Sequence, residues 1–553
     1  MLNSPRSSGG HGAKRKVLVL GLDGATFDII EPMVESSRLP VIGRLMCEGV
    51  WGDLESTIPP VTIPAWASMT TGMNPGKLGL YDLLRREGYG VEPNARCYED
   101  NNPVWKILNR YGVRTGVMNV PGTYPPDEVD GFMVTGMMTP SKKSPYYYPP
   151  TLGADLASTV EDYEIDVPHW KYFDEGNFVK DLYKVTEKRG RAAEYLIRHI
   201  ACEFYMIVFT SSDRLHHLLW DKREVVEAYW EELDSIIGRI LEQFEDDVTV
   251  FVVSDHGFTH LERTFFVNEW LNRKGFLKLR SQFINRSFVK FGRLVEGIYK
   301  FLGQLKLVRP IAGLLNKIMG LDRISKYTYS YLSNVNLEGR VDWGRTRAFS
   351  CVHTPEFGQI YVNMVGKMRE GSVSEEERER VLDSILKKLE RLPGTRWGER
   401  AHVEAFRAKE VYSGPHLDAA PDIVFTLDGG RCEVDAKVGE GRVFAKGAPL
   451  TNWKGTHVRE GVFIARGPGI TSGLRLEKAM IMDVAPTVLH VFGVPPTQEM
   501  DGRVLREIFE DGAVFPSMEP LEDVYEERKE SPALTPLEKT LIEARLKKLG
   551  YIS

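Results

Sequence analysis

Cysteine is scarce in this sequence, and no two cysteines form a Cys-x-x-Cys pair. The five that occur are scattered along the chain: Cys47, Cys97, Cys202, Cys351 and Cys432. An odd number without regular spacing argues against a disulfide framework, since such frameworks pair their cysteines. We therefore expect free thiols and a reducing compartment, the cytoplasm.

Long apolar runs and a strong charge of one sign are also missing. No run approaches the ~20 apolar residues that a membrane-spanning helix needs, and no apolar signal core follows the basic start at residues 1–16. A formal net charge of −6 on 553 residues gives no general attraction to nucleic acid or to anionic membranes. The hydrophobic fraction of 42% is typical of a soluble globular protein.

Short apolar segments alternate with amphipathic segments of helical length along most of the chain. The clearest apolar segments are 17–20, 115–120, 205–209, 248–253 and 462–465, and the clearest amphipathic ones are 176–200, 225–244 and 374–392. This alternation predicts an α/β fold with a mostly parallel central sheet that helices cover on both faces.

The length predicts more than one structural unit. We expect a disordered arm (1–14), a core in two pieces (15–280 and 327–515), a helical insertion (281–326) and a charged tail with one helix (516–553). The insertion holds nine basic and two acidic residues, which leaves −13 on the rest of the chain. Its interleaved apolar residues predict a cap that packs on the core. The alternative is a basic surface that weakly binds an anionic membrane or partner.

Three aspartates each follow the end of an apolar segment. Asp23 follows the first, Asp213 follows 205–209 and Asp255 follows 248–253. The carboxyl ends of parallel strands share one edge of the sheet, where ligands bind. Carboxylates that converge there repel one another unless cations offset their charge. The sequence therefore predicts a cation site at this edge.

Imidazoles stand beside these aspartates. His217 follows Asp213 by four residues, so that one helical turn places both on one face. His256 directly follows Asp255, and His457 lies on a predicted glycine loop before the segment 462–465. Mixed imidazole and carboxylate ligands indicate a metal such as zinc rather than magnesium alone.

A threonine begins the predicted helix at residues 62–71. Thr62 suits the N-cap, Pro64 the first turn and Gly72 the end of the helix. Without a metal nearby, this pattern indicates only a capped helix. Beside a metal, the positive end of the helix favours both an alkoxide at Thr62 and a bound phosphate.

The order of these motifs resembles the type I phosphodiesterase/nucleotide pyrophosphatase family of the alkaline phosphatase superfamily. The matching motifs are Asp23-Gly, Thr62-Ile-Pro, Asp213-x-x-x-His217, Asp255-His256-Gly and Gly-x-His457, within residues 16–509. The resemblance implies a three-layer, alkaline-phosphatase-like core and two divalent metal ions, Zn²⁺ with Mn²⁺ as an alternative. It assigns one ion to Asp213, His217 and His457, and the other to Asp23, Asp255, His256 and the Thr62 oxygen.

One position departs from the family pattern. Members carry an asparagine downstream of the nucleophile that contacts a phosphate oxygen, and residues 79–86 contain none. Arg85, Arg86 or the Thr62 backbone N–H could hold that oxygen instead.

The resemblance implies a phosphodiesterase or nucleotide pyrophosphatase that acts on a small phosphate ester through a phosphothreonine at Thr62. Two alternatives stay open: a phosphomutase or phosphotransferase on the same core, and a non-catalytic scaffold that uses the basic insertion. A threonine rather than a serine nucleophile counts against the mutase. The sequence leaves open the leaving group and the oligomeric state.

Overall fold

The computed structural model describes residues 15–94, 102–167, 175–245, 247–280, 337, 339–351, 354–394, 399–449, 451–521 and 534–548. The chain divides into two compact units. Unit 1 comprises Met1–Asn74, Ala95–Phe258 and Arg459–Glu538, and unit 2 comprises Pro75–Asn94, Thr259–Val458 and Lys539–Ser553. The predicted arm 1–14 and the predicted insertion 281–326 lie outside the described residues.

Unit 1 is built on a nine-stranded sheet with the strand order β20-β2-β19-β9-β1-β8-β5-β6-β7. Its strands are β1 (Lys16–Leu22), β2 (Val50–Glu55), β5 (Thr115–Met118), β6 (Gly131–Val134), β7 (Tyr147–Tyr148), β8 (Phe204–Phe209), β9 (Val248–Val253), β19 (Glu460–Arg466) and β20 (Leu474–Met480). Every segment that the sequence predicts as a strand lies in this sheet.

Most strand pairs of the sheet are parallel. β1 runs parallel to β8 and β9, β5 to β6 and β8, and β2 to β20, whereas β19 is antiparallel to β2 and β9, and β7 to β6. All residues of β8 and β9 are buried, as expected for strands covered on both faces. The predicted α/β fold with a mostly parallel central sheet is confirmed.

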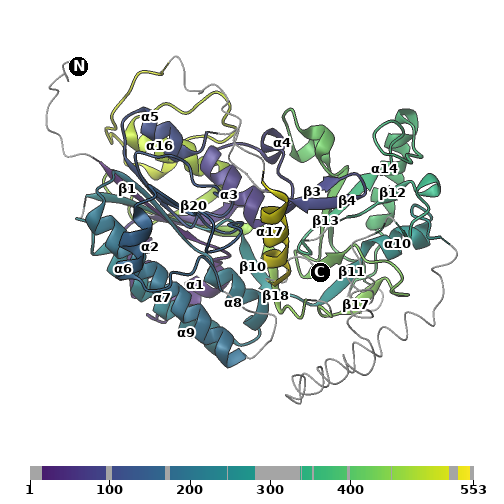
Figure 1. The fold of residues 1–553 in the computed structure, drawn as a ribbon, viewed down its shortest axis with the longest axis horizontal. Coiled ribbons are helices and arrows are strands. Elements are labelled where there is room, and N and C mark those ends of the chain that lie inside the picture. Colours follow the sequence, from purple (N-terminus) through teal and green to yellow (C-terminus); the bar gives the residue numbers. More distant parts are fainter. Residues whose placement is uncertain are drawn as a thin grey trace. The chain divides into compact units, whose positions relative to one another are not determined.

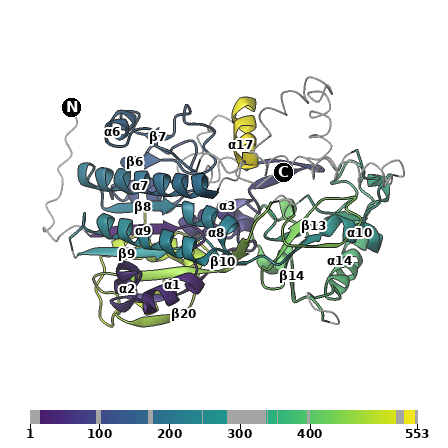
Figure 2. The same cartoon turned by 90° about the horizontal axis from the view of Figure 1, so that it is seen from below.

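Helices cover both faces of the sheet. They are α1 (Phe27–Glu35), α2 (Pro40–Cys47), α3 (Thr62–Thr71), α5 (Val104–Arg110), α6 (Leu152–Thr159), α7 (Glu175–His199), α8 (Ser211–Leu219), α9 (Arg223–Leu241) and α16 (Val484–Phe492). Figure 1 shows α3, α5 and α16 on one side of the sheet and α1, α2, α7, α8 and α9 on the other. On the side of the sheet that carries α1 and α2, the helices α7, α8 and α9 pack against one another (Figure 2).

The strand register aligns the carboxyl ends of three neighbouring strands. Leu22 of β1 pairs with Phe209 of β8, and Gly21 pairs with Val253 of β9. The loops that follow β1, β8 and β9 therefore leave the sheet at one edge, as the sequence predicts. β19 runs the other way, with Phe463 opposite Val253, so this edge holds its first residues instead of its last.

Among its described residues, unit 2 contains sheets with the strand orders β16-β11-β17, β12-β13-β15-β14 and β3-β4; β18 lies outside these sheets. The strands are β3 (Leu84–Glu87), β4 (Gly90–Pro93), β11 (Arg263–Phe266), β12 (Ala348–Phe349), β13 (Gly358–Val362), β14 (Val403–Arg407), β15 (Ile423–Leu427), β16 (Cys432–Asp435), β17 (Phe444–Lys446) and β18 (Gly455–Val458). Its helices are α4 (Pro75–Leu78), α10 (Val267–Lys274), α14 (Glu375–Leu389) and α15 (Ala408–Val411).

Two elements, β10 (Gly257–His260) and α17 (Pro536–Lys548), span positions at which the chain passes from one unit to the other. α17 corresponds to the helix predicted in the charged tail. Ser374, with Glu377, forms a capping box at the start of α14, which explains the predicted helix start there. No helix among the described residues is both long and apolar enough to cross a membrane.

Candidate active site

Three buried aspartates stand at the shared edge of the unit 1 sheet. Asp23 directly follows β1, Asp213 lies in the first turn of α8 after β8, and Asp255 follows β9. Each has an exposed fraction of 0%. Since α8 begins at Ser211, Asp213 and His217 lie one turn apart on it.

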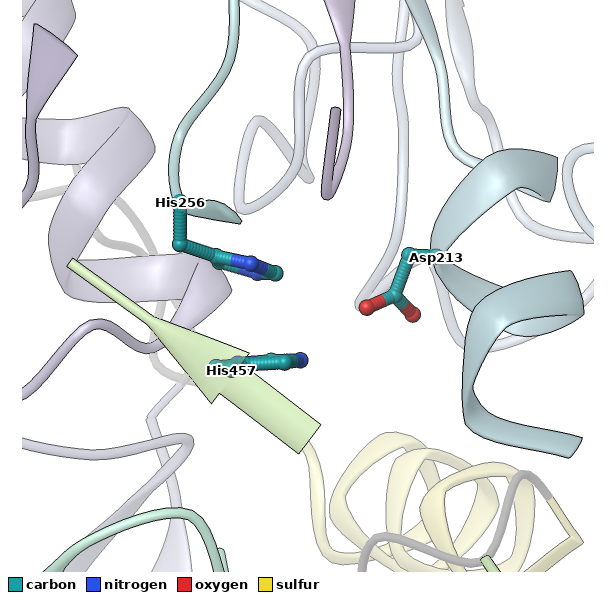
Figure 3. Close-up of side chains that lie close together, drawn as sticks. All are labelled: Asp213, His256 and His457. Carbon is teal, nitrogen blue, oxygen red and sulfur yellow. The ribbon is translucent and has the colours of Figure 1, made fainter. Parts of the chain in front are cut away.

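The imidazoles of unit 1 lie close to these carboxylates. His256 Nε2 is 3.2 Å from Asp255 Oδ2 and 3.7 Å from Asp23 Oδ1, and His217 Nε2 is 3.3 Å from Asp213 Oδ1. Asp23, Asp255 and His256 each offer a donor atom within 4.8 Å of the others. Figure 3 shows the Asp213 carboxylate and the His256 ring facing the same space.

These separations fit metal ligands better than hydrogen-bonded pairs. Two donors about 2.1 Å from a tetrahedral ion stand about 3.4 Å apart. The measured separations, between 3.2 and 3.7 Å, fall around that value. The carboxylate and imidazole donors of unit 1 therefore suit divalent ions such as Zn²⁺ or Mn²⁺.

The surroundings of Asp23 disfavour an ionised carboxylate unless a cation lies beside it. Burial raises the pKa of its carboxyl well above the usual range, and the charges of Asp255 and Asp213 raise it further, against the opposing effects of Arg214 and Trp66. Neither carboxylate oxygen of Asp23 accepts a hydrogen bond of ordinary geometry from a described residue, although the Trp66 indole lies near enough to lower the pKa of the carboxyl. A buried carboxylate in this state needs a cation or a proton.

Hydroxyl groups fix the loops that carry the aspartates. Ser212 Oγ donates to the backbone carbonyl of Asp23 (2.7 Å), and Ser56 Oγ donates to that of Asp255. The backbone N–H of Gly24 donates to Asp255 Oδ1 (3.2 Å). The loops after β1 and β9 are thus connected to each other and to α8, which fixes the positions of the three aspartates.

The two adjacent histidines on α8 have different surroundings. His216 Nε2 accepts from Trp230 Nε1 (3.0 Å), and His216 Nδ1 lies 3.1 Å from the carbonyl oxygen of Gly24. Burial lowers the pKa of His216 to about 3, so that the ring is neutral with its proton on Nδ1. Nδ1 of His216 thus holds Gly24 and Nε2 is taken by Trp230, so the ring serves the site indirectly.

His256 directs one nitrogen toward the carboxylates. Its Nδ1 lies 3.2 Å from the carbonyl oxygen of Gly257. A proton on Nδ1 leaves Nε2, the atom nearest Asp23 and Asp255, as the lone-pair donor. This is the arrangement that a metal-binding imidazole requires.

Thr62 is the first residue of α3, and the predicted N-cap role is wrong. The N-cap residue is Val61, and no side chain caps the helix. Thr62 is 0% exposed, and its Oγ1 has no hydrogen-bond partner among the described residues. Since Thr62 lies inside the first turn, its hydroxyl is not used to cap the helix and is available for another partner.

The first turns of α3 face the end of β1. The Trp66 ring packs so closely on Gly21 that a Cβ at Gly21 would lie 2.4 Å from a ring carbon. The same indole lowers the pKa of the Asp23 carboxyl. Thr62 and Trp66 are four residues apart and share one face of the helix. That face is directed toward Asp23.

A buried arginine that the sequence analysis missed supports Asp213. Arg214 has an exposed fraction of 0%; its guanidinium donates to Asp213 Oδ2 and, at 3.0 Å, to Asp166 Oδ2. An arginine directly after an aspartate, close behind the apolar segment 205–209, was the available signal. Arg214 fixes the orientation of one candidate ligand and offsets part of the negative charge.

His457, the seventh predicted ligand, belongs to unit 2. It lies on β18 rather than on a glycine loop, and it is 1% exposed. Its Nε2 is 3.6 Å from Oε1 of Glu356, which is equally buried. The sequence analysis also missed Glu356, because nothing in its local sequence separates it from a surface glutamate.

The two arginines predicted to contact substrate lie on β3 of unit 2. Arg85 is paired with Glu92, with its Nε 2.7 Å from Oε1. The Arg86 guanidinium lies over the Tyr361 ring, with its Cζ 4.8 Å from the centroid. A role of either residue in binding phosphate stays a prediction.

Unit 2 also buries carboxyl groups with raised pKa values. Burial is the main cause for both Asp82, with a pKa of about 7, and Glu433, with a pKa of about 8. Hydrogen bonds from Thr354 to Asp82 and from Thr264 to Glu433 oppose the effect in part.

The raised pKa of Glu433 predicts a loss of stability with rising pH. In the unfolded chain the Glu433 carboxyl has its ordinary pKa of 4.5, but in the folded chain its pKa is about 8. Between pH 4.5 and pH 8 the folded state therefore holds a proton on Glu433 that the unfolded state has lost. The free energy of unfolding falls as the pH rises through this range. We expect Glu433→Gln to lessen this fall by a few kcal/mol. Urea unfolding at pH 5.5 and pH 8 measures the free energy of unfolding of both proteins. The same pH dependence in Glu433→Gln as in the wild type would contradict a raised pKa of Glu433.

Comparison with known proteins identifies the family. A family model described as type I phosphodiesterase/nucleotide pyrophosphatase matches residues 17–437. Two solved structures of murine ectonucleotide pyrophosphatase/phosphodiesterase 5, one of them inactive and in complex with AMP, are similar at 13% identity and a TM-score of 0.46, covering 90% of this chain and 100% of theirs. A search of curated proteins finds no match. The chain belongs to the type I phosphodiesterase/nucleotide pyrophosphatase family, and it is a hydrolase of phosphate esters.

Proposed function

We propose that this protein is a two-metal phosphodiesterase or nucleotide pyrophosphatase in which Thr62 is the nucleophile. The observation that carries the proposal is the buried Thr62 hydroxyl without a hydrogen-bond partner among the described residues, on a helix face directed toward the equally unsatisfied Asp23 carboxylate. A buried hydroxyl and a buried carboxylate in this state are costly unless a ligand compensates them.

The ligand sets follow the family resemblance. Asp23, Asp255, His256 and the Thr62 oxygen would hold one ion, and Asp213, His217 and His457 the other. When bound, the ions supply Lewis acidity to the phosphoryl group and lower the pKa of hydroxyl groups beside them.

Thr62 Oγ attacks phosphorus in line with the leaving group. The Oγ–P bond forms as the ester P–O bond breaks, the proton that Thr62 loses balances the one that the departing oxygen takes up, and the product leaves as the alcohol. Water then attacks the phosphothreonine and restores the hydroxyl. The N–H groups of Thr62 and Ile63, in the first turn of α3, have no acceptor within the helix and can bind the phosphoryl oxygens.

Pro64 suits this arrangement because it has no N–H. It occupies the third position of α3, where an N–H would otherwise lack an intrahelical acceptor. The first turn therefore presents two adjacent donors and a hydroxyl to a phosphate. We propose a small, nucleotide-like phosphate ester as the substrate; the cytoplasmic location stays a prediction.

The stereochemical course at phosphorus tests the mechanism. Two in-line displacements, first by Thr62 and then by water, give net retention of configuration. Direct attack by water gives inversion. We expect retention when the metal-reconstituted enzyme hydrolyses a chiral phosphorothioate diester in ¹⁸O-labelled water, measured by ³¹P NMR. Inversion would rule out the phosphothreonine.

A further inference from the structure

We propose that Glu356 is an additional ligand of the ion that His457 binds; both residues belong to unit 2. The inference rests on the proposed function, because it assumes that His457 holds a metal. It adds a residue to the seven ligands that the family motifs indicate.

The distance between the two side chains supports shared coordination. Glu356 Oε1 and His457 Nε2 are 3.6 Å apart, beyond an ordinary hydrogen bond and close to the ~3.4 Å expected between donors of one tetrahedral ion. Glu356 and His457 each offer a donor atom within 4.8 Å of the other. Both side chains are 1% exposed, so water screens neither of them well.

The backbone on each side of Glu356 is fixed. The carbonyl of Pro355 accepts from the backbone N–H of Val434 in β16 (2.6 Å). Gly358 begins β13, and the Phe425 ring covers it so closely that a Cβ at Gly358 would lie 2.1 Å from a ring carbon. Glu356 is therefore held in position by residues on both sides, as a metal ligand should be before the ion arrives.

The backbone of His457 is also fixed within unit 2. Gly430, in the turn after β15, has a φ of +84°, and a Cβ there would lie 2.7 Å from the His457 carbonyl oxygen. A side chain at Gly430 would thus displace β18. The close contact between Gly430 and the His457 carbonyl fixes His457 relative to β15. β15 pairs with β13, which begins two residues after Glu356, so both side chains are held by the same sheet.

The surrounding charges favour a cation at Glu356. The negative charge of Glu356 is one cause of the raised pKa values of both Asp82 and Glu433. Three buried carboxyls thus share one region, and two of them retain protons into the neutral range. An ion bound by Glu356 would offset this charge without requiring all three to be protonated.

Metal binding by isosteric variants tests the inference. We expect Glu356→Gln to lower the affinity for one of two ions by about 10- to 100-fold, the range seen when a metal site loses a supporting group. Competition with a chromogenic chelator gives the affinity of each ion, and the d–d spectrum of the Co²⁺-substituted protein reports the ligand set. Glu433→Gln, at another buried glutamate of unit 2, is the matched control and should bind both ions as the wild type does.

The outcomes separate this inference from the proposed function. A wild-type protein that binds fewer than two ions would count against both. Two ions in the wild type, with unchanged affinity and an unchanged Co²⁺ spectrum in Glu356→Gln, would overturn the Glu356 assignment alone. If Glu356→Gln does not fold, Glu356→Asp replaces it: the carboxylate stays but is withdrawn by one methylene, so the affinity should fall and the spectrum should change. Wild-type behaviour of Glu356→Asp would then contradict the inference.

Discussion

Replacing Thr62 by alanine is expected to lower kcat/KM by at least about 10³-fold, since loss of a nucleophile that acts with its partners as a unit has effects of this size or larger. The fold should persist, because Thr62 caps no helix and its hydroxyl makes no hydrogen bond to a described residue. Hydrolysis of bis-p-nitrophenyl phosphate measures the activity, and elemental analysis measures the bound metal. We expect most of the metal to remain, because Thr62 contributes one ligand among several.

The same helix supplies a control for this variant. Thr70 is 1% exposed and donates its hydroxyl hydrogen to the carbonyl of Trp66 (2.8 Å). We expect Thr70→Ala to lower stability by about 1 kcal/mol, the net value of one hydrogen bond, and to leave kcat/KM nearly unchanged. Activity of Thr62→Ala close to that of Thr70→Ala would remove Thr62 as the nucleophile.

Replacing Arg214 by methionine is expected to destabilise the protein by about 3–5 kcal/mol. The guanidinium is fully buried and pairs with the carboxylates of Asp213 and Asp166, which are 0% and 2% exposed. Removing the cation leaves buried negative charge that the interior solvates poorly. It also withdraws the positive charge that lowers the pKa of Asp23. Urea unfolding at pH 7 measures the loss.

A second substitution identifies the cause of this loss. In Arg214→Met with Asp166→Leu, one buried carboxylate is removed together with its cation, so much of the stability should return. Asp213, which lies 3.3 Å from His217 Nε2 in the wild type, is not substituted in either variant. If the double variant is no more stable than the single one, lost packing rather than uncompensated charge explains the effect of Arg214.

The central sheet could be predicted because its strands carry a local signal. β8 and β9 are short, wholly apolar segments between amphipathic helices, which is the pattern of parallel strands buried on both faces. Once the sheet is parallel, the residues after each strand must gather at one edge. The gathering of Asp23, Asp213 and Asp255 therefore followed from the sequence together with a general rule of α/β folds.

Other features depended on contacts between distant segments. The helix boundary at Thr62 differs by one residue from the prediction, and this difference leaves the hydroxyl unused as a cap. The burial of Arg214 depends on Asp166, 48 positions earlier in the sequence. Glu356 differs from a surface glutamate only because β13 and β16 hold its neighbours in place.

The sequence by itself determined the α/β class, the order of the motifs and the set of carboxylates and imidazoles at the carboxyl edge of the sheet, because these follow from local hydrophobic patterns and strand direction. Only the tertiary structure decided the antiparallel direction of β19, which brings the start of that strand to the same edge, and the burial of Arg214 and Glu356. Strand direction and the burial of charge depend on partners far away in the chain, and no local pattern of residues specifies them.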